Sequence, residues 1–157
     1  MSKQLVVYIS ATGTTRRVAQ HLAKAIDADL AEIVPAPPFT AQDIDWTDPT
    51  SRASRQHADR AMRPPISASP SVDGYDEIFV GYPLWWDTAP REVRTWLESH
   101  DFTGKTITTF ATSSSSTRGA LGEQLHDSAP DAHWVNGRRF AANASEAELK
   151  TWADSIA

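Results

Sequence analysis

The chain has 157 residues, no cysteine, and 15 Lys and Arg against 20 Asp and Glu, which gives a net charge of −5. This length suits a single domain over residues 1–157, and the lack of cysteine excludes disulfides, thiolate nucleophiles and cysteine-based metal sites. The acidic balance disfavours nucleic acid as a partner, and the apolar run near the N-terminus is too short for a signal peptide or a membrane span. We therefore expect a cytoplasmic protein with neither nucleic acid nor membrane as a partner.

The first predicted unit is a strand over 5–9, a turn and a helix that contains Val18 and Leu22. A turn in this place directs free backbone N–H groups and the positive end of the helix dipole at one point, which suits a phosphate. The turn lacks both the Lys of a P-loop and the spacing of GxGxxG, so triphosphates and dinucleotides are disfavoured. An ordinary helix cap is the alternative. The residues of the turn are Ser10, Ala11, Thr12, Gly13, Thr14 and Thr15.

A second strand is predicted over 30–34, which makes a strand, helix, strand unit with a parallel pair and a right-handed crossover. Residues 35–74 then interrupt the pattern, because seven of the ten prolines lie there and exclude one continuous helix. We expect two short helices in this insertion, one from near Thr40 and one within 51–62. They occupy the place of the second crossover helix of a doubly wound fold.

The second half of the chain alternates strands with helices. Strands are predicted over 77–82, 106–111 and 132–135. After the loop 83–89, Pro90 suits the first position of a helix that buries Val93, Trp96 and Leu97 and leaves Arg91, Arg94 and Glu98 in solvent. A weaker helix carries Leu121 and Leu125. Ser145 and Glu148 have capping-box spacing at the start of the last helix, whose apolar face is Leu149, Trp152, Ala153 and Ile156.

Five strands alternating with helices predict an α/β fold: a three-layer, doubly wound, five-stranded parallel sheet with the order 2-1-3-4-5. Ligands of such sheets lie beyond the carboxyl ends of the strands, at the switch point. The loops 10–15, 83–89 and 112–118 follow strands one, three and four. They are therefore expected to meet at one edge.

These loops offer different chemistry. Trp85 and Trp86 could stack on a flat aromatic ligand, although each could instead pack in the core. The four consecutive serines 113–116 provide hydroxyl and N–H groups for the polar edge of a ring, although they could equally form a solvated linker. A phosphate pocket, an aromatic wall and a polar rim together describe a site for a mononucleotide with a planar ring system.

The chain resembles the flavodoxin-like FMN-binding proteins, in particular small bacterial flavodoxin-like domains with a Pro-rich second crossover. The resemblance runs nearly end to end. Its motifs are the turn 10–15, Gly81-Tyr82-Pro83-Leu84-Trp85-Trp86, Ala89-Pro90, Phe102-Thr103-Gly104-Lys105 and Phe110-Ala111-Thr112-Ser113, with Asp43-Ile44-Asp45-Trp46 in the insertion and Asn143-Ala144-Ser145-Glu146 before the last helix.

The resemblance implies non-covalent FMN as the cofactor. It places the phosphate on Ser10, Thr12, Gly13, Thr14 and Thr15, and the isoalloxazine against Pro83, Leu84, Trp85 and Trp86 on one side and Thr112, Ser113, Ser114, Ser115 and Ser116 on the other. One feature departs from the family, because Ser114-Ser115 replaces a common Gly pair. A serine in the left-handed backbone conformations that glycine adopts easily costs about 1 kcal/mol.

Other candidates are weaker. No pair of the five histidines has metal-site spacing, and the G-x-S-x-G elbow of hydrolases is missing. In the insertion, Asp45-Trp46 and the arginines Arg52, Arg55 and Arg60 could cover the flavin, contact an electron donor or join two subunits, or could be ordinary solvated residues.

The function expected is that of an FMN-dependent oxidoreductase in which the flavin performs the chemistry and no residue acts as a dedicated acid or base. The electrons would pass from a nicotinamide or a partner reductase to a small acceptor such as a quinone. The alternatives are a single-electron carrier that docks on redox proteins, which the modest net charge disfavours, and a non-redox phosphate or nucleotide module. The oligomeric state stays open.

Overall fold

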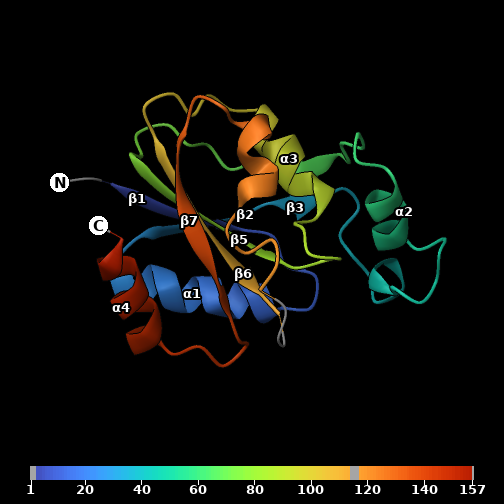
Figure 1. The fold of residues 1–157 in the computed structure, drawn as a ribbon, viewed down its shortest axis with the longest axis horizontal. Helices are drawn as coiled ribbons and strands as arrows, with labels where there is room; N and C mark the ends of the chain where they lie inside the picture. The colour runs from blue at the N-terminus through green and yellow to red at the C-terminus, as the bar shows by residue number, and fades with distance from the viewer. Residues whose placement is uncertain (1–2, 114–116, 157) are drawn as a thin grey trace.

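A computed structural model describes residues 3–113 and 117–156 (Figure 1). Its centre is a five-stranded sheet in the order β2-β1-β5-β6-β7, in which every neighbouring pair is parallel. This order confirms the predicted 2-1-3-4-5 arrangement of a doubly wound fold. The strands are β1 (Gln4–Tyr8), β2 (Asp29–Glu32), β5 (Glu77–Pro83), β6 (Thr106–Thr112) and β7 (His133–Phe140).

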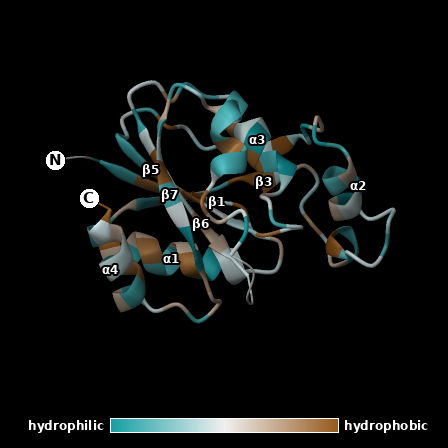
Figure 2. Ribbon diagram, viewed as in Figure 1, coloured by the Kyte–Doolittle hydropathy of each residue, from teal (hydrophilic) through white to brown (hydrophobic). Residues whose placement is uncertain are grey.

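Helices cover both faces of this sheet. Helix α1 (Thr14–Ile26) and helix α4 (Glu146–Ser155) lie on one face, while α3 (Arg91–Glu98) and the 3₁₀ helix η2 (Glu123–Ser128) lie on the other (Figure 1). Two buried clusters fill the layers: one joins Leu22 and Trp152 to Phe110, and the other joins Val93 and Trp96 to the opposite face. Hydrophobic residues accordingly follow the strands and α1 in Figure 2. No helix of the described residues is long and apolar enough to cross a membrane.

The last helix begins as the sequence predicts. The Ser145 hydroxyl accepts a hydrogen bond from the Glu148 N–H at 3.1 Å, which satisfies one of the free donors of the first turn. The Glu148 carboxylate forms an ion pair with Arg138 at 3.3 Å. Leu149, Trp152 and Ala153 are buried, as their spacing indicates.

Several elements differ from the prediction. The chain leaves the sheet after Glu32, and β3 (Val34–Pro35) instead pairs antiparallel with the short strand β4 (Ile66–Ala68) inside the insertion. Strand β7 continues to Phe140, five residues beyond its predicted end. The weak helix is a 3₁₀ helix that follows Gly122, so Leu121 lies outside it and is 44% exposed. Sequence alone missed the two strand changes because long-range pairing decided them.

The predictions for α3 are wrong at its first residue and on its solvent face. Pro90 is the cap rather than the first helical residue, and Arg91 is only 7% exposed. Arg94 is also largely covered, because it donates to Asp127, to Ser128 and to the carbonyl of Gln124. The reason is tertiary, since η2 and the insertion pack against the side of α3 that an isolated amphipathic helix would leave in water.

The Pro-rich insertion contains η1 (Gln42–Ile44) and helix α2 (Arg52–Ala58), close to the two short helices expected. It lies beside α3 (Figure 1). The fully buried Glu92 of α3 accepts a hydrogen bond from Gln56 at 2.9 Å and pairs with Arg52 at 3.4 Å, and burial raises the pKa of Glu92. Gln56 also accepts from the N–H of Arg91 at 3.0 Å. Polar contacts of α2 therefore fix the insertion to the body of the domain.

Stability is expected to fall at acid pH partly through Glu98. Arg63 of the insertion donates to both oxygens of this carboxylate, at 2.9 and 3.1 Å, and the Ser128 hydroxyl donates at 2.8 Å. The bond from Arg63 is the main reason that the pKa of Glu98 lies below its ordinary value. Because folding favours the charged form, the stabilisation is complete above the ordinary carboxyl pKa and is lost as the pH falls through the lower folded value.

The Glu98→Gln variant tests this expectation. Its stability should decline less than that of the parent between about pH 7 and about pH 3, a window that spans carboxyl titration. Urea unfolding monitored by circular dichroism at each pH gives both curves. Parallel curves would show that Glu98 does not contribute to the acid loss.

Candidate functional site

The turn 10–15 follows β1 at the carboxyl edge of the sheet. Gly13 caps α1 with a positive φ of 94°, and its N–H donates to the Ser10 hydroxyl at 3.0 Å. A Cβ on Gly13 would meet nothing within 4 Å, so the space beside the turn is open. The N–H groups of Thr14, Thr15 and Arg16 find no acceptor in the described parts of the chain. An open space with several unused donors fits a phosphate.

Thr112 joins the three predicted loops. Its hydroxyl lies 2.7 Å from that of Thr15, a buried hydrogen bond between the first turn and the end of β6. Its carbonyl accepts from the N–H of Leu84 at 3.1 Å, which connects the second loop. The fold therefore brings the three segments together as expected. The hydroxyls of Thr15 and Thr112 serve this contact, and their role in binding FMN stays a prediction.

The second loop makes a tight turn with an unusual backbone. Trp85 and Thr88 exchange N–H···O bonds of 2.8 and 3.2 Å across it. The two central residues, Trp86 and Asp87, have positive φ values of 50° and 67°. Positive φ at both central positions is a feature of type I′ turns, in which Asn or Gly normally occupies these positions. Backbone strain of this kind gathers at functional sites because the surrounding structure must hold it in place.

A neighbouring segment holds the turn. The buried Tyr82 hydroxyl donates to the Gly119 carbonyl at 2.7 Å. Gly119 has a φ of +84°, and a Cβ on it would lie 2.0 Å from the Asp87 carbonyl oxygen. Glycine is thus required here by both conformation and space. The sequence analysis did not single out Gly119, and a lone glycine after a serine run gave no specific signal.

The two tryptophans of this loop diverge. The half-buried Trp85 meets the Phe39 ring edge-on, with centroids 5.1 Å apart. Trp86 is 39% exposed and stacks on His57 of α2, with centroids 4.6 Å apart and an interplanar angle of 15°. Both partners come from the insertion. The Pro-rich segment therefore supports the aromatic wall, a role that the sequence analysis did not predict for it.

The third loop is described only at its ends. Arg139 of β7 donates to the Ser113 carbonyl through Nη2 at 2.7 Å and Nε at 3.2 Å, so it fixes the start of the loop. Sequence reasoning missed Arg139. The predicted contacts Ser114, Ser115 and Ser116 lie outside the described residues. Arg16, beside the first turn, donates to the Tyr8 hydroxyl and pairs with Glu32 at 2.9 Å, which raises its pKa.

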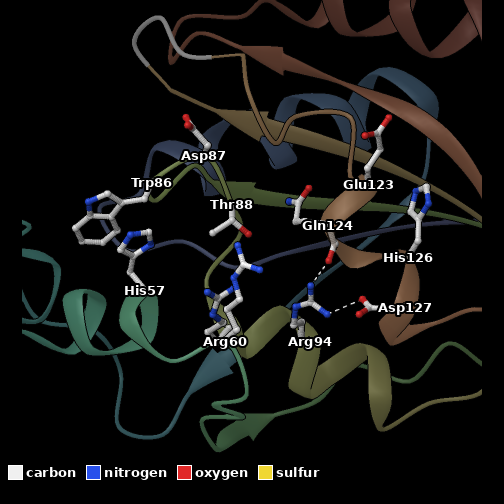
Figure 3. A pocket seen from close by; sticks show the side chains of 11 residues that line it. His57, Arg60, Trp86, Asp87, Thr88, Arg94, Glu123, Gln124, His126 and Asp127 are labelled. Atoms are coloured by element: carbon white, nitrogen blue, oxygen red, sulfur yellow. Dashed lines mark hydrogen bonds and ion pairs between the residues drawn. The ribbon is translucent and has the colours of Figure 1, made fainter.

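A separate cavity of about 560 Å³ begins where the aromatic wall ends (Figure 3). It lies between α2, the turn of Trp86, α3 and η2. Its lining includes none of the phosphate-turn residues. The sequence did not indicate it, because its walls come from four elements far apart in the chain. The lining residues are His57, Arg60, Trp86, Asp87, Thr88, Arg91, Arg94, Glu123, Gln124, His126 and Asp127.

Comparison with known proteins identifies the family. The family model for flavodoxins matches residues 3–156, nearly the whole chain. The chain belongs to the flavodoxin family. Membership confirms the flavodoxin-like FMN-binding family that the sequence resembles, and FMN as the cofactor that goes with it.

In the described part of the chain, no group of three His, Asp or Glu residues is placed to hold a metal ion.

Solved structures of flavoproteins share this fold. A candidate flavoprotein from Bacteroides eggerthii is 42% identical, with a TM-score of 0.91 over 99% of this chain and 98% of that one. Another from Bacteroides uniformis is also 42% identical, with a TM-score of 0.90 over 98% of both chains. A Lactobacillus acidophilus flavoprotein in complex with FMN is 20% identical, with a TM-score of 0.69 over 98% and 99%, and shows the fold alone. A search of curated proteins found no match.

Proposed function

We propose that this flavodoxin is an FMN-dependent oxidoreductase that passes electrons from a nicotinamide or a partner reductase to a small acceptor such as a quinone. The observation that carries the proposal is Thr112, which joins the phosphate turn to the aromatic loop through its hydroxyl and its carbonyl. A single binding site that offers phosphate-binding groups at one end and aromatic side chains at the other suits FMN. The Lactobacillus acidophilus flavoprotein, which has the same fold, is known in complex with FMN.

Residues of this chain would hold the two ends of the cofactor. The free N–H groups of Thr14, Thr15 and Arg16, with the hydroxyls of the turn, would bind the phosphate. Trp86 and Leu84 would flank the ring system and shield it from water. When bound, FMN supplies hydride or single-electron chemistry.

The hydroxyl of Tyr82 keeps its proton throughout the neutral range. Burial raises the pKa of Tyr82 to about 12, so the hydroxyl continues to donate to Gly119. This bond keeps the Gly119 segment against the turn of Trp86 and Asp87. This hydrogen bond between Tyr82 and Gly119 is therefore independent of pH near neutrality.

Two observations favour a small substrate over a protein partner. The cavity of about 560 Å³ beside Trp86 has the size of a small-molecule site. The net charge of −5 gives a weaker docking field than strongly acidic carriers use. A single-electron carrier is the second candidate, and the partly exposed Trp86 is where such a partner would approach.

Two measurements test the proposal. Calorimetric titration of the apoprotein with FMN should show saturable binding of one FMN per chain and give a yellow protein. Failure to bind FMN would contradict the proposal, and the non-redox phosphate- or nucleotide-binding module would remain as the alternative. Oxidation of NADH and NADPH by the FMN-loaded protein should then be faster with a quinone or nitroaromatic acceptor than with cytochrome c. Turnover with cytochrome c alone would favour the carrier.

A further inference from the structure

The cavity beside Trp86 contains a buried arginine with unused donors. Arg91 is 7% exposed and its Nε donates to the Gln56 carbonyl at 3.1 Å. Its two Nη atoms have no hydrogen-bond partner among residues 3–113 and 117–156. Neither Nη atom is among the buried side-chain atoms that lack a partner, so both are open to the solvent of the cavity and can donate to a ligand there. Arg91 therefore has donor capacity that the described chain does not use.

A second arginine reaches the same cavity from the insertion. Arg60 lies just after α2, is exposed, and its guanidinium has no partner among the described residues. Figure 3 shows Arg60 and Arg94 on the same side of the cavity, below Thr88 and Gln124. Arg60 and Arg91, which are about thirty residues apart in the sequence, thus both place a positive charge at this cavity.

Most of the other charges around this space are neutralised. Arg94 pairs with Asp127 at 2.7 Å, and Asp87 lies 3.7 Å from Arg118. The carboxylate of Glu123 points away from Arg60 in Figure 3. Positive charge therefore remains beside Arg60 and Arg91, where Asp59 offsets it only in part, while Glu123 adds a negative charge elsewhere in the lining.

These arginines repel one another. Burial lowers the pKa of Arg91, and the like charges of Arg94, Arg60 and Arg63 lower it further, against the attraction of Asp59. An anion between Arg60 and Arg91 would relieve this repulsion. It would also accept hydrogen bonds from the guanidinium N–H groups of both arginines. A phosphate dianion can accept hydrogen bonds from both arginines at once and offers more acceptor oxygens than a carboxylate.

We infer that this cavity binds the phosphate group of a small molecule between Arg60 and Arg91. The inference rests on the proposed function, because Trp86 belongs to both the aromatic wall and the cavity, so the occupant would lie beside the flavin. The stacked rings of Trp86 and His57 form a flat rim on which an aromatic ring could rest. The phosphate could come from a nicotinamide dinucleotide or from another phosphorylated compound.

The test is a calorimetric titration of the FMN-loaded protein, freed of excess FMN, with adenosine 2′,5′-bisphosphate and with inorganic pyrophosphate. At least one probe should bind saturably at one site per chain. Arg60→Ala should weaken binding at least about tenfold, the usual scale for a lost charged hydrogen bond. The matched control is Arg55→Ala, which removes the same charge from an exposed residue of α2 outside the cavity, and it should leave the affinity within about twofold.

The two probes separate the sources of the phosphate. Tighter binding of adenosine 2′,5′-bisphosphate favours a nicotinamide dinucleotide, and equal or tighter binding of pyrophosphate favours another phosphorylated compound. Binding of neither probe, or equal losses in Arg60→Ala and Arg55→Ala, would overturn the inference. Absorbance at the start of each titration reports FMN loading, so failure of the flavin proposal is seen separately, and the protein without FMN is titrated in parallel.

Discussion

The Gly13→Val variant is expected to bind FMN at least about 100-fold more weakly than the parent, a loss of about 2.8 kcal/mol. Gly13 has a φ of 94°, where a β-branched residue is strained, and the space beside it is open for a ligand. Valine would either keep the backbone and fill this space or shift the first turn of α1 and its N–H groups. Both results remove the proposed phosphate contacts.

Gly74→Val is the matched control. Gly74 has a φ of 83° and open space around its Cβ position, so it carries a similar backbone strain. It precedes β5 and therefore lies at the opposite edge of the sheet from the three loops. Calorimetric FMN titrations should show loss of affinity in Gly13→Val alone. Equal affinities of Gly13→Val and the parent would remove the first turn from the site.

The Gly119→Ala variant should lower the free energy of unfolding by about 2 to 4 kcal/mol, the sum of backbone strain and a collision in a packed region. The added methyl group would start 2.0 Å from the Asp87 carbonyl oxygen, which is backbone and cannot rotate away. Either Gly119 or the turn of Trp86 and Asp87 must move. We expect FMN affinity to fall with stability, because the aromatic wall moves.

Gly74→Ala separates the two contributions to that loss. Its φ of 83° is nearly that of Gly119, but its Cβ would meet nothing within 4 Å. Urea unfolding of this variant therefore measures the strain alone, and the excess loss in Gly119→Ala measures the collision. An equal loss in both variants, with FMN affinity unchanged, would show that Gly119 does not support the turn.

The amino-acid sequence by itself determined the order of the sheet and the edge at which the three loops meet. Apolar runs such as 77–82 indicate strands buried on both faces, and the hydroxyl-rich turn around Gly13 marks the start of α1. These features are local, because a strand's hydrophobic run and a helix cap depend on neighbours in sequence. Parallel topology then brings the three loops to one edge without further information.

Only the tertiary structure decided the contacts between elements. The hydrogen bond of Thr15 to Thr112 and the stack of Trp86 on His57 join segments far apart in the chain. The burial of Arg91 contradicts its place on a predicted solvent face, because the Pro-rich insertion covers that side of α3. Helical periodicity indicates which residues share a face of a helix. Which face is exposed to water depends on the elements that pack against it. A polar contact between elements leaves no periodic pattern in the sequence from which it can be predicted.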